Sequence, residues 1–125
     1  MGVTLDTGAL IALGRGDPRT RRLIDAYANQ GQIPAVPTVA LAEAWRDGRR
    51  QARLVRLLGR CELVPLTARL AMRAGELMGR VGTSDAVDAV IACAAAERGD
   101  AVVTSDPNDF ARFTANLRQL RVSAI

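Results

Sequence analysis

Short apolar runs alternate along the chain with longer segments in which apolar residues recur every three or four positions. The short runs are typical of buried strands and cover Val3 to Leu5, Ile33 to Val36, Cys61 to Leu66, Ala101 to Thr104 and Arg121 to Ile125. The segments between them have helical spacing. Strands that alternate with helices predict a three-layer α/β/α fold around a mainly parallel central sheet of four to five strands.

Capping residues and glycines set the expected helix boundaries. Asp17 before Pro18, Thr67, and Ser84 or Asp85 are suited to begin helices, and Gly99 is suited to end one. A helix that begins after Pro37 is expected to place Glu43 near its N-terminal end. A strongly basic helix is expected from Arg49 to Arg60, and a short one around Phe110 to Phe113.

The chain has 125 residues, of which 49% are apolar, and this predicts a single domain over residues 1–125. No apolar stretch is long enough to cross a membrane. Asp6 and the lack of a preceding basic residue argue against a secretory signal, so we expect a cytoplasmic protein with no membrane partner.

Histidine and lysine are both missing, since all 17 basic residues are arginine. A Ser-His-Asp or Cys-His mechanism would lack its base, and a histidine-ligated zinc site would lack its ligands. A P-loop would lack its lysine. Any enzymatic chemistry must therefore use carboxylates, hydroxyls, arginine, backbone groups and water.

Four carboxylates stand at the end of an apolar run or near a helix start: Asp6, Glu43, Asp88 and Asp106. Each alone is explained as a helix cap, a turn or a solvated position. Together they suggest one site, because the carboxyl ends of parallel strands share an edge of the sheet. Clustered carboxylates require a cation, and oxygen ligands suit Mg²⁺ or Mn²⁺. Asp85, one turn before Asp88, is a further candidate metal ligand or a cap.

A formal charge of +4 and a pI of about 10.4 favour a polyanionic partner such as RNA. Six arginines follow Glu43 at largely helical spacing, and several of them form a candidate RNA-binding stripe: Arg46, Arg49, Arg50 and Arg53, with Arg56 and Arg60 after them. A solvated helix face explains the same pattern. The few aromatic residues argue for recognition of a folded RNA by shape and phosphate contacts.

The motifs around these acids resemble a known family. Asp6-Thr-Gly-Ala-Leu-Ile-Ala-Leu, Leu41-Ala-Glu43, Asp88-Ala-Val-Ile-Ala and Val103-Thr-Ser-Asp106 with Asp109-Phe110 resemble the PIN-domain nucleases, above all their VapC-type toxins. The resemblance covers the full length. It departs at Gly8, where the family commonly has Ser.

This resemblance implies an endoribonuclease that depends on Mg²⁺ or Mn²⁺ and cleaves structured RNA of the tRNA or rRNA class. It also implies a homodimer that a cognate antitoxin holds inactive. The four acids match the family's catalytic and metal-binding quartet, Thr104 matches its supporting hydroxyl, and Thr7 and Ser105 are further supporting candidates.

Two other functions fit parts of the sequence. A non-catalytic basic α/β module that binds RNA or a partner protein would use the acids only as caps. A phosphatase or receiver domain fits less well, because such folds generally use a lysine near the phosphate and a second Asp close to the first, which the segment around Asp6 lacks.

Overall fold

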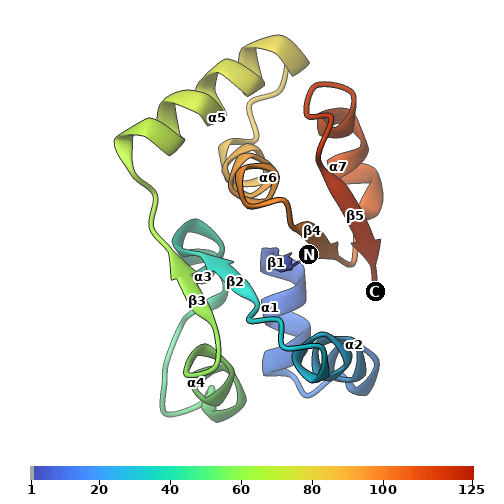
Figure 1. The fold of residues 1–125 in the computed structure, drawn as a ribbon. Coiled ribbons are helices and arrows are strands. Elements are labelled where there is room, and N and C mark those ends of the chain that lie inside the picture. Colours follow the sequence, from blue (N-terminus) through green and yellow to red (C-terminus); the bar gives the residue numbers. More distant parts are fainter. Residues whose placement is uncertain (1) are drawn as a thin grey trace.

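The computed structural model describes residues 2–125, which form five strands and seven helices (Figure 1). The strands are β1 (Val3–Leu5), β2 (Ala35–Pro37), β3 (Glu62–Val64), β4 (Ala101–Thr104) and β5 (Arg121–Ala124). The helices are α1 (Thr7–Gly14), α2 (Pro18–Asn29), α3 (Thr38–Ala44), α4 (Ala52–Leu58), α5 (Ala68–Val81), α6 (Ala86–Arg98) and α7 (Pro107–Thr114). None of these helices has the length and apolarity needed to cross a lipid bilayer.

All five strands are parallel and lie in the order β3-β2-β1-β4-β5. In Figure 1, α1, α2 and α4 lie on one side of the sheet and α5 to α7 on the other, and α3 follows the end of β2 and contacts both α1 and α6. This confirms the predicted three-layer fold with a parallel central sheet. The chain reverses its direction of winding between the neighbours β1 and β4, and such switch points open a crevice at the carboxyl ends of the strands.

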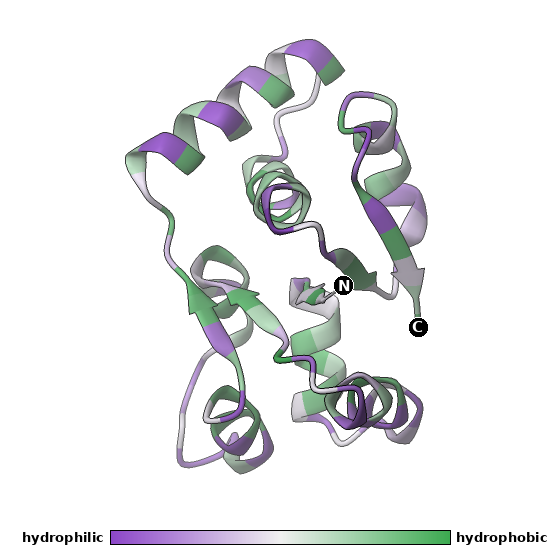
Figure 2. Cartoon of the chain, in the orientation of Figure 1, coloured by the Kyte–Doolittle hydropathy of each residue, from purple (hydrophilic) through white to green (hydrophobic). Residues whose placement is uncertain are grey.

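The core lies around the central strands and α6. Every residue of β1 and β4 is buried, and so are residues 89–96 of α6. Five of these eight residues are alanines, whose small side chains let α6 lie close to the sheet and to its neighbouring helices. Figure 2 shows α6 apolar along most of its length, whereas α5 alternates in hydropathy and buries one stripe.

Several predicted helix boundaries are confirmed. Asp17, Thr67 and Asp85 cap α2, α5 and α6 through their side chains. Gly82 and Gly99 end α5 and α6 with a left-handed backbone, which glycine adopts without steric cost.

Two predictions about the segment after β2 are wrong. Glu43 is the penultimate residue of α3 and lies at its C-terminal end. The predicted basic helix starts only at Ala52, because the preceding residues form turns. Gln51 explains both differences: its amide donates to the Ala44 carbonyl over 2.8 Å and accepts from the Arg46 and Asp47 backbone N–H groups. These bonds end α3 and fold the chain back.

A buried carboxylate that the sequence analysis did not consider lies at the opposite, amino edge of the sheet. Asp100 is 3% exposed, accepts a hydrogen bond of 2.9 Å from the Thr4 hydroxyl and pairs with the Arg98 guanidinium at 3.0 Å. Arg98 also pairs with Glu62 at 2.9 Å, so it links the end of α6 to the edge strand β3. These contacts are structural and distant from the carboxyl edge.

Candidate active site at the carboxyl edge of the sheet

Asp6 and Asp106 follow β1 and β4, the two strands at the switch point. The Asp6 backbone N–H donates to the Val103 carbonyl of β4, and the Asp6 carboxylate caps α1 by accepting from the Ala9 N–H over 2.7 Å. The buried Thr104 hydroxyl hydrogen-bonds the Asp6 side chain and accepts from the Asp106 N–H at 2.9 Å. One hydroxyl therefore connects the residues that follow the two strands.

Asp6 is 7% exposed, and its environment opposes ionisation. Burial raises the pKa of its carboxyl group, while the hydrogen bonds from Thr104 and Ala9 lower it. The negative charges of Asp106 and Asp109 raise it further. Burial and the neighbouring charges therefore outweigh the hydrogen-bond donors, and they favour the protonated form of Asp6.

Asp85 and Asp88 form a second carboxylate group at the start of α6. Asp85 caps the helix by accepting from the Asp88 N–H at 3.1 Å. The guanidinium of Arg112 in α7 lies 3.4 Å from the Asp85 carboxylate and 3.6 Å from that of Asp88. Arg112 is held by a 3.0 Å hydrogen bond to the Thr83 hydroxyl and lies 4.8 Å above the Phe113 ring. An arginine thus occupies the position of a counter-ion between two candidate site acids.

The pKa of Asp88 is raised to about 7, and burial is the largest cause. The hydrogen bond and charge of Asp85 and the charge of Asp109 raise this pKa as well, and Arg112 lowers it. Near neutral pH the Asp88 carboxyl group is therefore divided between its protonated and ionised forms.

Glu43 reaches the same edge from α3. Its carboxylate is exposed and accepts a 2.7 Å hydrogen bond from the hydroxyl of Thr7, the first residue of α1. Glu43 is thereby tied to the residue next to Asp6. Ser105 lies close as well, since a Cβ atom added to Gly8 would stand 2.8 Å from the Ser105 hydroxyl oxygen. The Ser105 hydroxyl therefore fills the space beside Gly8.

The family model of the PIN domain matches residues 3–116, which is most of the chain. The protein belongs to the PIN domain family. No curated protein matched the chain.

Solved structures agree with this assignment at the level of the fold. One is VapBC2 from Rickettsia felis bound to a promoter DNA fragment, with 20% identity, a TM-score of 0.76, and coverage of 100% of this chain and 99% of that chain. A toxin-antitoxin complex from Klebsiella pneumoniae matches with 18% identity, a TM-score of 0.78, and coverage of 99% and 100%. DNA-bound VapBC from Salmonella typhimurium matches with 17% identity, a TM-score of 0.69, and coverage of 99% of this chain and 98% of that chain.

Asp109 and Arg112 were not among the predicted site residues. Asp109 lies in the first turn of α7, and its charge raises the pKa of both Asp6 and Asp88. It thus connects the two carboxylate groups of this PIN domain electrostatically. The available signal was spacing, because Asp106, Asp109 and Arg112 follow one another at intervals of three and share a helix face.

The PIN domain brings its candidate acids to one edge in separate groups. Within residues 2–125, no three acidic or cysteine side chains lie close enough to hold a metal ion together. The donor chemistry nevertheless fits a hard divalent cation, since every candidate ligand is a carboxylate and Arg112 already stands in as a cation between two of them. Metal ligation by Asp6, Glu43, Asp88, Asp106 and Asp85 stays a prediction.

The predicted arginine stripe is not a continuous helix face. Arg46 donates to the carbonyls of Ala42 and Trp45 at the end of α3, and Arg49 and Arg50 lie in the turns that follow. Arg53 and Arg56 belong to α4, and Arg60 lies in the turn after it. The cause is the early end of α3 described above, which separates the first three arginines of the predicted stripe from the last three, and RNA binding by these arginines stays a prediction.

Proposed function

We propose that this PIN domain is an endoribonuclease that depends on Mg²⁺ or Mn²⁺ and is the toxin of a toxin–antitoxin pair. The observation that carries the proposal is that acids from four distant segments lie along the switch-point edge of a PIN fold, in separate groups that Asp109 couples electrostatically. Asp6 is buried there, and the pKa of Asp88 is raised to about 7 by burial and neighbouring carboxylates. Shifted carboxyl groups of this kind support a catalytic site more than a set of helix caps.

The residues at the carboxyl edge of the sheet would have different roles in the proposed reaction. Asp6, Glu43, Asp88 and Asp106 would hold the cation, with Asp85 as an additional oxygen donor. A bound divalent ion supplies an activated water and neutralises charge that develops on the phosphate. Thr104 fixes the orientation of Asp6, and Thr7 fixes that of Glu43. Asp88 has a pKa raised by burial and by its neighbouring carboxylates, and the bound cation would favour its ionised form.

The composition and the exposed side chains support structured RNA of the tRNA or rRNA class as substrate. Seventeen arginines supply positive charge, and no histidine is needed for metal-assisted hydrolysis. Phe110 and Phe113 are buried, so neither can stack on bases. Trp45 is 38% exposed, but its ring lies against Gly48. Phosphate contacts and RNA shape therefore fit the surface better than base stacking.

An antitoxin partner is part of the same proposal. The similar solved structures include toxin–antitoxin complexes. The geometry around Arg112 shows how one guanidinium can satisfy two site carboxylates, and a partner that supplies a further arginine would exclude a cation by the same chemistry. A homodimer is also proposed, and the exposed apolar side chains of Leu63, Leu66 and Met72 are available surface for it.

The test is cleavage of a mixture of cellular tRNA and rRNA by purified protein with Mg²⁺, Mn²⁺ or EDTA. We expect cleavage only with metal, and loss of at least 100-fold in rate for Asp6→Asn and Asp88→Asn. Glu76→Gln removes an exposed acid of α5 outside the edge and should cleave normally. RNA that is bound but never cut would favour the non-catalytic module, and cleavage that persists in EDTA would exclude the metal mechanism.

A further inference from the structure

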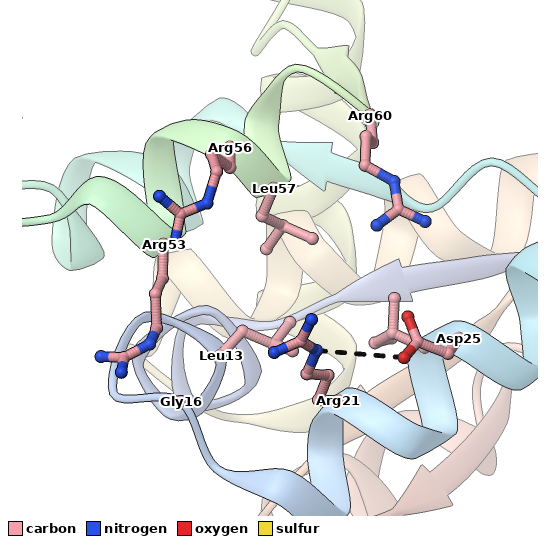
Figure 3. Close-up of a pocket in the computed structure, with 9 residues that line it drawn as sticks. Leu13, Gly16, Arg21, Asp25, Arg53, Arg56, Leu57 and Arg60 are labelled. Carbon is pink, nitrogen blue, oxygen red and sulfur yellow. Dashed lines mark ion pairs between the residues drawn. The ribbon is translucent and has the colours of Figure 1, made fainter.

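A pocket of about 290 Å³ lies between α2, α4 and the end of α1, away from the carboxylate edge (Figure 3). Its polar lining consists mainly of arginines, with Arg21 from α2 facing Arg53, Arg56 and Arg60 from α4 and the turn after it. Asp25 is the sole acid of the lining. No part of the candidate active site contributes to this pocket.

The positive charge of the pocket is not balanced by the protein. Asp25 forms an ion pair with Arg21 at 4.0 Å. Among residues 2–125, no ion pair within 4.0 Å involves Arg53, Arg56 or Arg60. Like charges around one concavity repel one another, and an anion would relieve that repulsion. The apolar side chains of Leu13, Ile24 and Leu57 line the same pocket, and the four arginines around it are exposed and accessible to a polyanion.

We propose that this pocket binds backbone phosphates of the RNA substrate as a site separate from the carboxylate edge. The inference rests on the proposed ribonuclease function for the identity of the polyanion. Guanidinium groups match phosphate oxygens with paired hydrogen bonds. A phosphodiester chain has a charge at every nucleotide, so one strand satisfies several arginines at once.

The position of the pocket explains why an acidic active site needs it. Asp6 precedes α1 and Gly16 follows its end, so at 1.5 Å per residue the pocket lies roughly 15 Å from the Asp6 end of the crevice. This separation exceeds the Debye length of about 8 Å at physiological salt, so the carboxylates do not cancel the field of the pocket. The edge repels RNA until a cation is present, and the pocket supplies attraction that does not depend on the cation.

Binding of a fluorescein-labelled RNA hairpin, followed by anisotropy in EDTA over a range of NaCl concentrations, tests the proposal. The key variant is R53Q/R56Q/R60Q. Its matched control is R19Q/R69Q/R118Q, which removes the same charge from exposed positions outside the pocket. We expect the pocket variant to weaken binding about 10- to 100-fold and to reduce the slope of log K against log salt by about 2, since each neutralised phosphate contributes about 0.7 to 0.9. The control should change affinity by less than about threefold.

A charge-preserving variant separates binding from folding. R53K/R56K/R60K keeps the charge and should keep most of the salt slope while losing affinity, because lysine lacks the planar fork. Equal losses in the pocket and control variants, or no loss in either, would overturn the proposal. A further result would overturn it: poly-L-glutamate binds the wild type but not the pocket variant, while the pocket variant binds RNA as tightly as the wild type. The occupant of the pocket would then be an acidic protein.

The outcomes distinguish this proposal from the proposed function. The anisotropy measurement contains chelator and does not need cleavage. Pocket-dependent RNA binding without any cleavage in metal would reject the nuclease and keep the phosphate site. Metal-dependent cleavage with binding indifferent to Arg53, Arg56 and Arg60 would keep the nuclease and reject the phosphate site.

Discussion

Removal of the Arg112 guanidinium should make the carboxylate edge bind a divalent cation more tightly. Arg112 lies 3.4 Å from the Asp85 carboxylate and 3.6 Å from that of Asp88, and its side chain is 35% exposed. Partly exposed ion pairs of this kind contribute about 0.5 to 1 kcal/mol each after solvent screening. A cation that displaces Arg112 must break both pairs, at a cost of about 1 to 2 kcal/mol, which corresponds to about 5- to 30-fold in affinity.

The assay is calorimetric titration of Mn²⁺ into wild type and Arg112→Gln at two pH values. Well above pH 7, where Asp88 is ionised, we expect the variant to bind Mn²⁺ about 5- to 30-fold more tightly. Well below pH 7 the gain should shrink, because protonated Asp88 no longer attracts the cation. In metal-free protein, NMR titration of the carboxyl carbon should place the pKa of Asp88 above its wild-type value, since the charge of Arg112 lowers it.

Arg118→Gln is the matched control, because it removes an exposed arginine that has no ion pair within 4.0 Å in residues 2–125. It should leave both the Mn²⁺ affinity and the pKa of Asp88 unchanged. Unaltered Mn²⁺ binding in Arg112→Gln at high pH, or an equal gain in the control, would refute the idea that Arg112 competes with the cation.

Three further changes test other parts of the structure. Asp88→Asn should flatten the pH dependence of the free energy of unfolding. In the wild type the folded-state pKa of about 7 lies above the unfolded value, so the folded state binds an extra proton and stability falls as pH rises from about 4 to about 7. Urea unfolding at several pH values measures this difference. Thr104→Val should lower the free energy of unfolding by about 1 to 2 kcal/mol and raise the pKa of Asp6, because it deletes a buried hydroxyl that bonds the carboxylate; an unchanged Asp6 titration by NMR would contradict this. Asp100→Ala should cost about 2 kcal/mol in the same unfolding assay, because it leaves the buried Thr4 hydroxyl without its acceptor and Arg98 with Glu62 alone, while RNA cleavage stays at the wild-type rate.

Features set by neighbours in sequence were predictable. Caps such as Asp17 and Thr67 act on N–H groups three residues away, and glycine ends α5 and α6 because few other residues adopt its backbone there. The placement of Asp6 and Asp106 was also predictable from the sequence, because an acid directly after a buried parallel strand must lie at the carboxyl edge of the sheet. These signals identified the fold and the location of the candidate site.

Features that depend on contacts between distant segments could not be predicted from the sequence. Gln51 ends α3 through backbone groups up to seven residues away, which displaced Glu43 and divided the predicted arginine stripe. Arg112 meets Asp85 only because α7 packs beside α6. The arginine pocket likewise needs α2 and α4 to face each other across the end of α1. Periodicity contains no information about such pairings.

Asp6 closes the first turn of α1 and is also one of the candidate site acids. Replacement by most residues would remove both contributions, and the loss of a cap alone costs about 1 kcal/mol. Asparagine is the one substitution that discards the charge and keeps the shape and the capping oxygen. A homologue that has lost its catalytic activity but keeps this fold should therefore have a neutral capping residue, such as Asn or Ser, at the position of Asp6.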